Sequence, residues 1–151
     1  MCAFFVGDNV EKYMNLALKE AKKAYKKGEI PIGAVIVKHG KVIAKAHNLK
    51  EHHNLSTAHA EILVINKANK KVKNWRLNEC ELYVTVEPCM MCCGAIIQSR
   101  ISTVIYGTKN ENFGYSKILE ENNVKIIKNV CKEECKNIIQ KFFVKKRNQN
   151  L

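Results

Sequence analysis

The sequence predicts an α/β domain with three layers, in which helices cover both faces of a mixed five-stranded sheet. Segments with apolar residues at helical spacing alternate with short runs rich in Val, Ile and Tyr, the pattern of strands connected through helices. Two strand runs flank a tight turn, and an antiparallel hairpin of this kind makes the sheet mixed. The chain has 151 residues without a repeat or a low-complexity linker, so we expect one domain over 1–151.

The first half of the chain predicts a helix, a hairpin of two strands, a polar loop and a second helix, over residues 9–27, 34–37 with 42–47, 49–56 and 58–69. The first helix has Val10, Met14 and Ala17 on one face, and Gly28 follows it in the position typical of a helix end. Thr57 is a good candidate N-cap for the second helix.

The second half predicts a strand, a helix, a strand, a short helix, a last strand and a terminal helix, over residues 82–86, 90–99, 101–106, 116–122, 124–127 and 132–147. Pro88 suits the first turn of the helix that follows it, because its missing N–H would be unpaired there anyway. Gly107 is expected to end the second of these strands, and residues 109–115 are expected to form a loop.

Two segments carry the residues that favour metal chemistry. His59, Cys89 and Cys92 offer the imidazole and thiolate ligands that zinc prefers, and catalytic zinc sites use three protein ligands and leave the fourth position to water. The two cysteines are at i and i+3 of the predicted helix, so they lie on one helix face. His59 and Glu61 are expected in the first turn of theirs. One Zn²⁺ ion is therefore the predicted cofactor.

Glu61 distinguishes a catalytic metal from a structural one. Zinc lowers the pKa of a bound water from about 16 towards about 7, which produces a nucleophile at neutral pH. An unligated carboxylate beside that water can accept its proton and hand it to the substrate. A purely structural zinc site has no use for such a group.

Spacing alone leaves two questions open at this site. Cys93 is at i+4 from Cys89 and lies on nearly the same helix face as Cys92, so either cysteine could be the third ligand. Cys131 and Cys135 could instead complete a structural site with four thiolates, although such a site leaves the histidine and the glutamate without a role.

The charge and the cysteine content bear on partners and compartment. The formal net charge of +12 is compatible with nucleic-acid binding, yet 23 Lys, 3 Arg and 16 Asn are also what AT-rich codon usage would produce. Seven cysteines, two of them adjacent, favour reduced thiols over a disulfide framework. No stretch approaches the ~20 apolar residues of a membrane span, and the apolar run at the N-terminus is too short for a signal peptide. We expect a cytoplasmic protein without a membrane partner.

The two segments together form H-x-E…P-C-x-x-C, the known signature of zinc-dependent nucleobase deaminases. Further matching segments make the chain resemble the bacterial tRNA-specific adenosine deaminases of the cytidine deaminase-like superfamily: 28–35, 58–61, 82–92, 94–96, 99–101 and the aromatic and basic 142–147. The resemblance implies hydrolytic deamination of adenosine to inosine at the wobble position of a tRNA anticodon, by zinc-hydroxide attack at C6 with Glu61 as proton shuttle.

The resemblance also implies roles for individual residues. It selects His59, Cys89 and Cys92 as the ligands of one zinc ion per subunit, in a homodimer that binds a tRNA anticodon stem-loop. The substrate contacts that it implies are Asn48 on the flipped base, Ile30 lining the pocket, and Ala60 and Glu87. The expected nucleic-acid contacts are Lys109, Asn110, Lys145, Lys146 and Arg147.

The segment after Gly107 departs from the family pattern in composition, and it is several residues shorter up to Val124. Asn110 stands where the family has an aspartate. This departure keeps a second hypothesis open, in which the protein deaminates free nucleobases or nucleosides of the guanine or cytosine type. A third hypothesis is a zinc-stabilised RNA-binding module or an inactive partner subunit, against which the presence of Glu61 argues.

Overall fold

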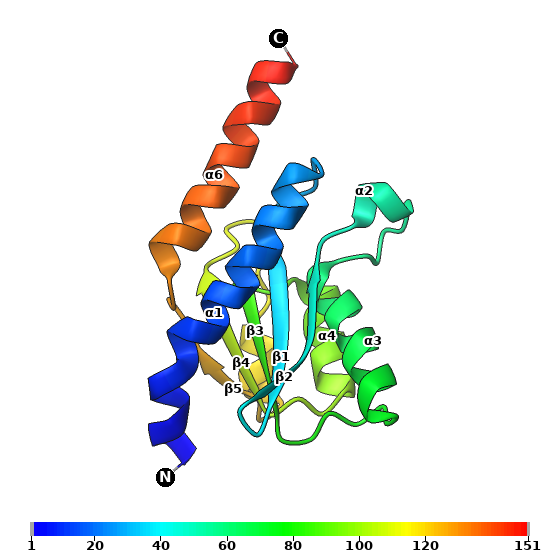
Figure 1. Cartoon of the computed structure of the whole chain (residues 1–151), viewed down its shortest axis with the longest axis vertical. Coiled ribbons are helices and arrows are strands. Elements are labelled where there is room, and N and C mark those ends of the chain that lie inside the picture. Colours follow the sequence, from blue (N-terminus) through cyan, green and yellow to red (C-terminus); the bar gives the residue numbers. More distant parts are fainter. Residues whose placement is uncertain (1, 151) are drawn as a thin grey trace.

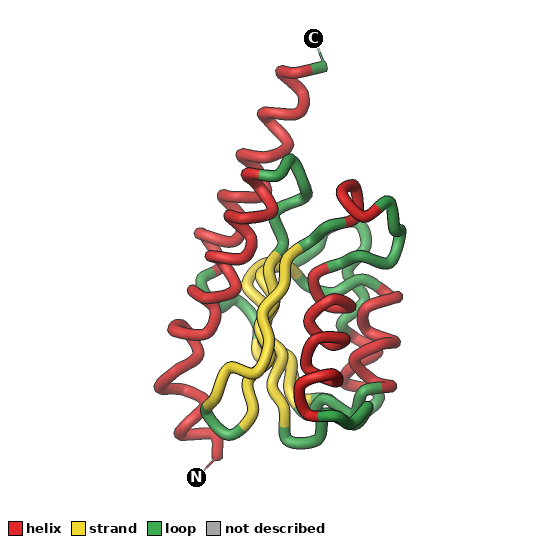
Figure 2. Tube along the Cα trace, turned by 45° about the vertical axis from the view of Figure 1, so that its right-hand side comes forward, coloured by secondary structure: helices red, strands yellow, loops and turns green. Residues whose placement is uncertain are grey.

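The computed structural model describes the backbone of residues 2–150 and the side chains of residues 9–150. A five-stranded sheet lies between two layers of helices (Figures 1 and 2). The strands are β1 (Gly33–Lys38), β2 (Lys41–His47), β3 (Cys80–Val86), β4 (Thr103–Thr108) and β5 (Lys125–Ile127). The helices are α1 (Cys2–Lys26), α2 (Lys50–His53), α3 (Ala60–Val72), α4 (Met90–Gln98), α5 (Lys117–Glu121) and α6 (Lys132–Gln149). The predicted three-layer arrangement with a mixed sheet is confirmed.

The sheet has the order β2-β1-β3-β4-β5, and its pairing brings four chain segments to one edge. β1 is antiparallel to both β2 and β3, whereas β3, β4 and β5 run parallel. The start of β1 and the ends of β2, β3 and β4 therefore lie at the same edge. The segments that enter or leave the sheet there include residues 30–32, 48–49, 87–89 and 109–116.

Each face of the sheet is covered by a different set of helices, so the strands are buried on both sides. α1 and α6 pack on the face that presents Val35, Tyr83 and Ile105. The helices α3, α4 and α5 cover the opposite face, where Ile36 and Leu82 belong to the larger apolar cluster. Burial on both faces explains why the central strands read as nearly continuous apolar runs.

The helix α3 begins later than the sequence predicts, whereas α4 begins at Met90 as predicted, and the residue before each helix is a predicted metal ligand. Thr57 is not the N-cap of α3, because His59 occupies that position with φ −78° and ψ 151°. Cys89 likewise is the N-cap of α4 rather than a residue of its first turn. Both ligands thus stand just outside the helices.

Two further boundaries differ from the prediction. The predicted loop 49–56 contains the short helix α2. Gly107 does not end its strand but lies inside β4, where an added Cβ would meet Cys135 Sγ and, at 2.7 Å, the carbonyl oxygen of Thr85. The glycine is therefore required by the close approach of α6 to the sheet and not by a turn.

The ends of the chain extend the helical layer that contains α1 and α6. α1 reaches back to Cys2, further than the predicted start at Asn9. The C-terminal turns of α6 project beyond the body of the protein, at the end of the molecule where α2 lies (Figure 1). Within residues 2–150, no helix is both long and apolar enough to cross a membrane.

Two glycines in regular structure differ in how much space surrounds them. A Cβ on Gly33, at the start of β1, would meet the carbonyl oxygen of Ala17 and, at 2.6 Å, the amide nitrogen of Ala21. These are backbone atoms of α1, which cannot rotate away as a side chain can. A Cβ on Gly94 in α4 would have nothing within 4 Å.

We expect the same substitution to have opposite effects at these two positions. Gly33→Ala should lower the free energy of unfolding by about 1–3 kcal/mol, because the methyl group displaces α1 from the sheet. Gly94→Ala should raise it by about 0.5–1 kcal/mol, because alanine loses less backbone entropy in a helix. Urea titrations of the zinc-loaded proteins measure both changes. Midpoints that shift in the same direction would contradict the packing of Gly33 against α1.

Candidate metal centre

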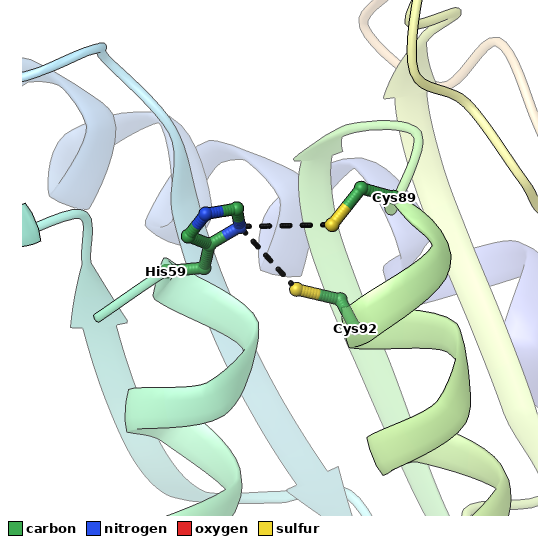
Figure 3. Close-up of side chains that lie close together, drawn as sticks. All are labelled: His59, Cys89 and Cys92. Atoms are coloured by element: carbon green, nitrogen blue, oxygen red, sulfur yellow. Dashed lines mark hydrogen bonds between the residues drawn. The ribbon is translucent and has the colours of Figure 1, made fainter. Parts of the chain in front are cut away.

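His59, Cys89 and Cys92 converge at the starts of two neighbouring helices (Figure 3). His59 and Cys89 are N-cap residues, and neither uses its side chain to cap its helix. Their side chains can therefore point beyond the helix ends towards one another. Cys92 lies in the first turn of α4, and the N-termini of α3 and α4 place positive dipole ends at this point, which stabilises thiolates.

The separations among the three ligand atoms fit one tetrahedral zinc ion. His59 Nδ1 lies 3.7 Å from Cys89 Sγ and 3.5 Å from Cys92 Sγ, and all three atoms lie within 4.8 Å of one another. Zinc–sulfur and zinc–nitrogen bonds of ordinary length at a tetrahedral angle require nitrogen–sulfur separations of about 3.6 Å. The donor set of one imidazole and two thiols also matches the preference of zinc for nitrogen and sulfur.

The protonation of the three groups is coupled through their mutual hydrogen bonds. Hydrogen bonds from Cys92 and His59 lower the pKa of the Cys89 thiol to about 4. The hydrogen bond to Cys89, together with burial, raises the pKa of Cys92. The pKa of His59 is raised, chiefly by its hydrogen bond to Cys89. These hydrogen bonds favour the thiolate form of Cys89, and a metal ion that binds the three groups would displace their remaining protons.

Glu61 lies two residues after His59, in the first turn of α3, and is buried. Its Oε1 atom has no hydrogen-bond partner among the residues that the structure describes. Burial raises the pKa of this carboxyl to about 7. An unpaired carboxylate oxygen away from water is costly for stability, so folding alone gives no reason for an acid at this position.

Among the side chains that the structure describes, the other cysteines do not join the cluster. The potential ligand group found in the described part of the chain consists of His59, Cys89 and Cys92. Cys93 is buried and directs its thiol to the carbonyl oxygen of Pro88, at 3.6 Å. Cys135 lies under Gly107, on the face of the sheet that α6 covers. No group of four thiolates forms among the described residues, and the second sulfur near His59 is that of Cys92 rather than that of Cys93.

Two of the predicted substrate residues are directly bonded to each other beside the ligands. Asn48 follows β2, is buried, and accepts a hydrogen bond from the amide of Ala60 through Oδ1, at 2.7 Å. This bond joins the end of β2 to the start of α3, one residue after His59. Ile30 precedes β1 at the same edge of the sheet and is 38% exposed, as a residue lining a binding surface would be.

Glu29 is a residue whose role in the site region the sequence did not reveal. Its carboxylate is buried and accepts hydrogen bonds from the amides of Glu51 and His52, at 3.1 and 2.8 Å, and contacts His52 Nδ1 at 2.7 Å. These contacts fix α2, and with it the loop that leads into His59. The sequence feature that could have indicated this role is the position of Glu29, a charged residue shortly before the apolar strand β1.

The residues predicted to contact nucleic acid divide into two groups. Lys109 is exposed and Asn110 half-buried in the loop after β4, next to Glu87, whose carboxylate accepts a hydrogen bond from the Asn110 amide. The other group lies on the projecting end of α6 and is exposed: Lys145, Lys146 and Arg147. The structure thus brings one group to the metal centre and leaves the other on a separate basic helix end.

We expect the zinc content to separate Cys92 from its neighbour. Cys92→Ala should lose the ion. Mutating a residue that only hydrogen-bonds to a zinc ligand lowers metal affinity by up to ~100-fold, so removing a ligand should lower it further. Cys93→Ala should retain about one zinc per chain, because its sulfur lies against Pro88. Metal analysis after dialysis against a chelator measures both. Zinc loss from the Cys93 variant alone would overturn the ligand assignment.

Comparisons with known proteins agree with this geometry. The model of the MafB19-like deaminase family matches residues 8–147. A tRNA-specific adenosine deaminase from Bacillus subtilis is 46% identical over 141 residues, which cover 88% of each chain.

Two solved structures resemble the chain. The first, from a study of A-to-I editing by deaminases at the wobble position of transfer RNA, is 36% identical with a TM-score of 0.80, and covers 84% of this chain and 98% of its own. A guanine deaminase from Bacillus subtilis is 38% identical with a TM-score of 0.65, and covers 73% of this chain and 74% of its own. By fold, by metal-ligand set and by identity over most of its length, the chain belongs to the tRNA-specific adenosine deaminase family, with a cytidine deaminase-like fold.

Proposed function

We propose that this protein is a zinc-dependent hydrolase that converts adenosine to inosine at the wobble position of a tRNA anticodon. The observation that carries the proposal is the buried, unpaired carboxylate of Glu61 beside three zinc-ligand side chains. The family relationship supports adenosine in tRNA as the substrate.

The residues of the site divide the chemistry among them. His59, Cys89 and Cys92 would hold the zinc ion, which when bound supplies the Lewis acid that makes water nucleophilic at neutral pH. Glu61 accepts one proton from the attacking water and delivers it to the ring nitrogen next to C6, and then transfers the second proton, from the new C6 hydroxyl, to the departing amine. Its raised pKa, about 7, suits a group that both accepts and donates protons near neutrality. Water adds at C6, ammonia leaves and inosine remains.

The base must leave any stack to reach this centre, as RNA-loop recognition allows. Asn48 uses its Oδ1 on Ala60, so its amide N–H groups are the atoms that would donate to the flipped base. Ile30 would line the pocket, with Glu87 behind the adjacent loop. Contacts with the anticodon stem-loop would come from the loop and helix groups described above, Lys109 with Asn110 and Lys145 to Arg147.

The assembly and location follow from the same family relationship. We propose a homodimer with one zinc ion per subunit, in which each tRNA contacts both subunits, and a cytoplasmic location where tRNA is available. The exposed apolar side chains Met90 and Leu55, 64% and 52% exposed, supply surface that a second subunit would cover.

Glu61→Gln tests the proton-transfer role. The amide keeps the size of the side chain but accepts no proton, so we expect kcat to fall by about 10²–10⁴-fold while the fold and the zinc content persist. Ammonia release from an anticodon stem-loop and metal analysis measure the two quantities. Wild-type turnover by this variant would exclude the mechanism, and zinc loss would instead make Glu61 a structural residue of the site.

A substrate panel tests the choice of substrate. The zinc-loaded protein should release ammonia from a stem-loop with a wobble adenosine, and not from free guanine, cytosine or adenosine. The alternative of a free-base deaminase is favoured by the similarity to a guanine deaminase and by the unusual loop after β4. Turnover of free guanine without activity on the stem-loop would select that alternative.

A further inference from the structure

The carboxylate of Glu87 is bonded to both ends of the loop that follows β4. Its Oε1 accepts a hydrogen bond from the amide of Asn110, at 3.2 Å. Its Oε2 accepts hydrogen bonds from the amide and the hydroxyl of Ser116, at 3.2 and 2.6 Å. One side chain, two residues before the zinc ligand Cys89, thus closes the loop of residues 110–116.

Backbone contacts fix the same loop against the segment that carries the ligand. The amide of Tyr115 donates to the carbonyl oxygen of Pro88, at 3.0 Å, and Gly114 pairs with Cys89 in an isolated β-bridge. A Cβ on Gly114 would meet the Glu87 carboxylate, so the glycine permits this close approach. The position of the loop is therefore set relative to the metal centre.

The hydrogen bonds of the loop adjoin a cavity. A cavity of about 510 Å³ lies between the loop, α5 and the ends of the last strands, and its lining includes Glu87, Tyr115 and Ser116. The Glu87 carboxylate thus both binds the loop amides and lines this cavity, so a change at this side chain should alter how the loop is held.

The loop presents aromatic rings to solvent. Phe113 is 73% exposed, the largest exposed fraction among the large apolar side chains of the described residues, and Tyr115 is 47% exposed. The Asn110 Oδ1 atom accepts a hydrogen bond from the Phe113 amide, at 3.1 Å, so the backbone that carries this ring is ordered. Unpaired bases of RNA loops stack on exposed aromatic side chains, and the cation of Lys109 on the same loop would favour the phosphates beside them.

We propose that Phe113 is a stacking platform for an unpaired base next to the target adenosine, and that Glu87 is the positioning residue that holds it there. The inference rests on the proposed function, since it assumes a single-stranded RNA loop at the metal centre. The inference assigns substrate selectivity to the Phe113 ring. The position of this ring depends on the Glu87 carboxylate and not on the zinc ligands.

The test compares stem-loop substrates that do and do not contain the neighbouring bases. Phe113→Ala should raise KM for an intact anticodon stem-loop by about 5- to 100-fold, the effect of one lost base–aromatic stack, with kcat retained. Two further stem-loops each carry an abasic site at one of the two nucleotides that flank the adenosine. On the stem-loop that lacks the stacked base, the wild-type enzyme and Phe113→Ala should have the same KM. Phe113→Trp should restore tight binding, because it keeps a flat ring.

The positioning role has its own variants. Glu87→Gln should raise KM in the same way and keep one zinc per chain, and Ser116→Ala, which removes one hydrogen bond, should give a smaller increase. Glu111→Gln removes a carboxylate that is exposed on the same loop, and Trp75→Ala removes an exposed aromatic ring from the segment between α3 and β3. Both controls should leave KM unchanged.

The possible outcomes separate this inference from the proposed function. Unchanged KM in Phe113→Ala, or an equal penalty on the intact and both abasic substrates, overturns the stacking role while the wild-type activity on the stem-loop stands. A kcat loss or a zinc loss in Glu87→Gln, with KM unchanged, overturns the positioning role. A wild-type enzyme that is inactive on every stem-loop overturns both this inference and the proposed function.

Discussion

The structure depends on one geometric constraint: three ligand atoms from two separate helix starts must lie within the reach of one small cation. His59 and Cys89 are thirty residues apart in the chain, yet their ligand atoms are 3.7 Å apart. The sheet makes this possible. The end of β2 leads through residues 48–59 to α3, and the end of β3 leads directly to α4, so both helices begin at the same edge. Because their N-terminal dipole ends meet there, the site is electropositive before any metal binds, which stabilises thiolate and the hydroxide chemistry that a zinc ion supports.

Around this centre, side-chain oxygen atoms accept hydrogen bonds from backbone segments that the hydrogen bonds of the sheet and helices do not stabilise. Asn48 bonds the start of α3, Glu29 bonds α2, and Glu87 bonds the loop after β4. In each case a buried or partly buried polar side chain accepts from backbone amides of another segment, which satisfies donors that would otherwise be unpaired near the site. Burial by itself would raise the pKa of Glu29, but the hydrogen bonds from His52 and Glu51 outweigh burial and lower this pKa. These hydrogen bonds therefore stabilise the fold above the ordinary carboxyl pKa, and this stabilisation is lost as the pH falls and Glu29 is protonated. Glu61 is the contrasting case, a buried carboxylate whose Oε1 atom has no hydrogen-bond partner among the described residues.

Periodicity and turn chemistry predicted each strand and nearly every helix, because burial on both faces of a sheet leaves a strong apolar pattern. The errors have a common cause. Thr57 is a better intrinsic N-cap than His59. The preference of proline for the first turn of a helix placed Pro88, and with it Cys89, inside the predicted helix. In the structure, His59 and Cys89 are themselves the N-cap residues. Local preference was overridden by the position that the metal site requires. Gly107 was interpreted as a strand end because glycine often interrupts strands, whereas the close approach of Cys135 on α6 is a long-range contact that no local pattern records.

By itself, the sequence determined the ligand types, the zinc chemistry that they allow and the need for an unligated acid, because these follow from the chemical identity of His59, Cys89, Cys92 and Glu61. Helical spacing places Cys92 and Cys93 on nearly the same face, and only the family resemblance selected Cys92. The tertiary structure adds the direction of each thiol, which depends on its surroundings: Cys92 faces His59, and Cys93 faces Pro88. The tertiary structure also revealed what Glu87 does. The family resemblance predicted a substrate contact at Glu87. Its hydrogen bonds to Asn110 and Ser116 join segments more than twenty residues apart, and such partners are set by how the chain folds back on itself.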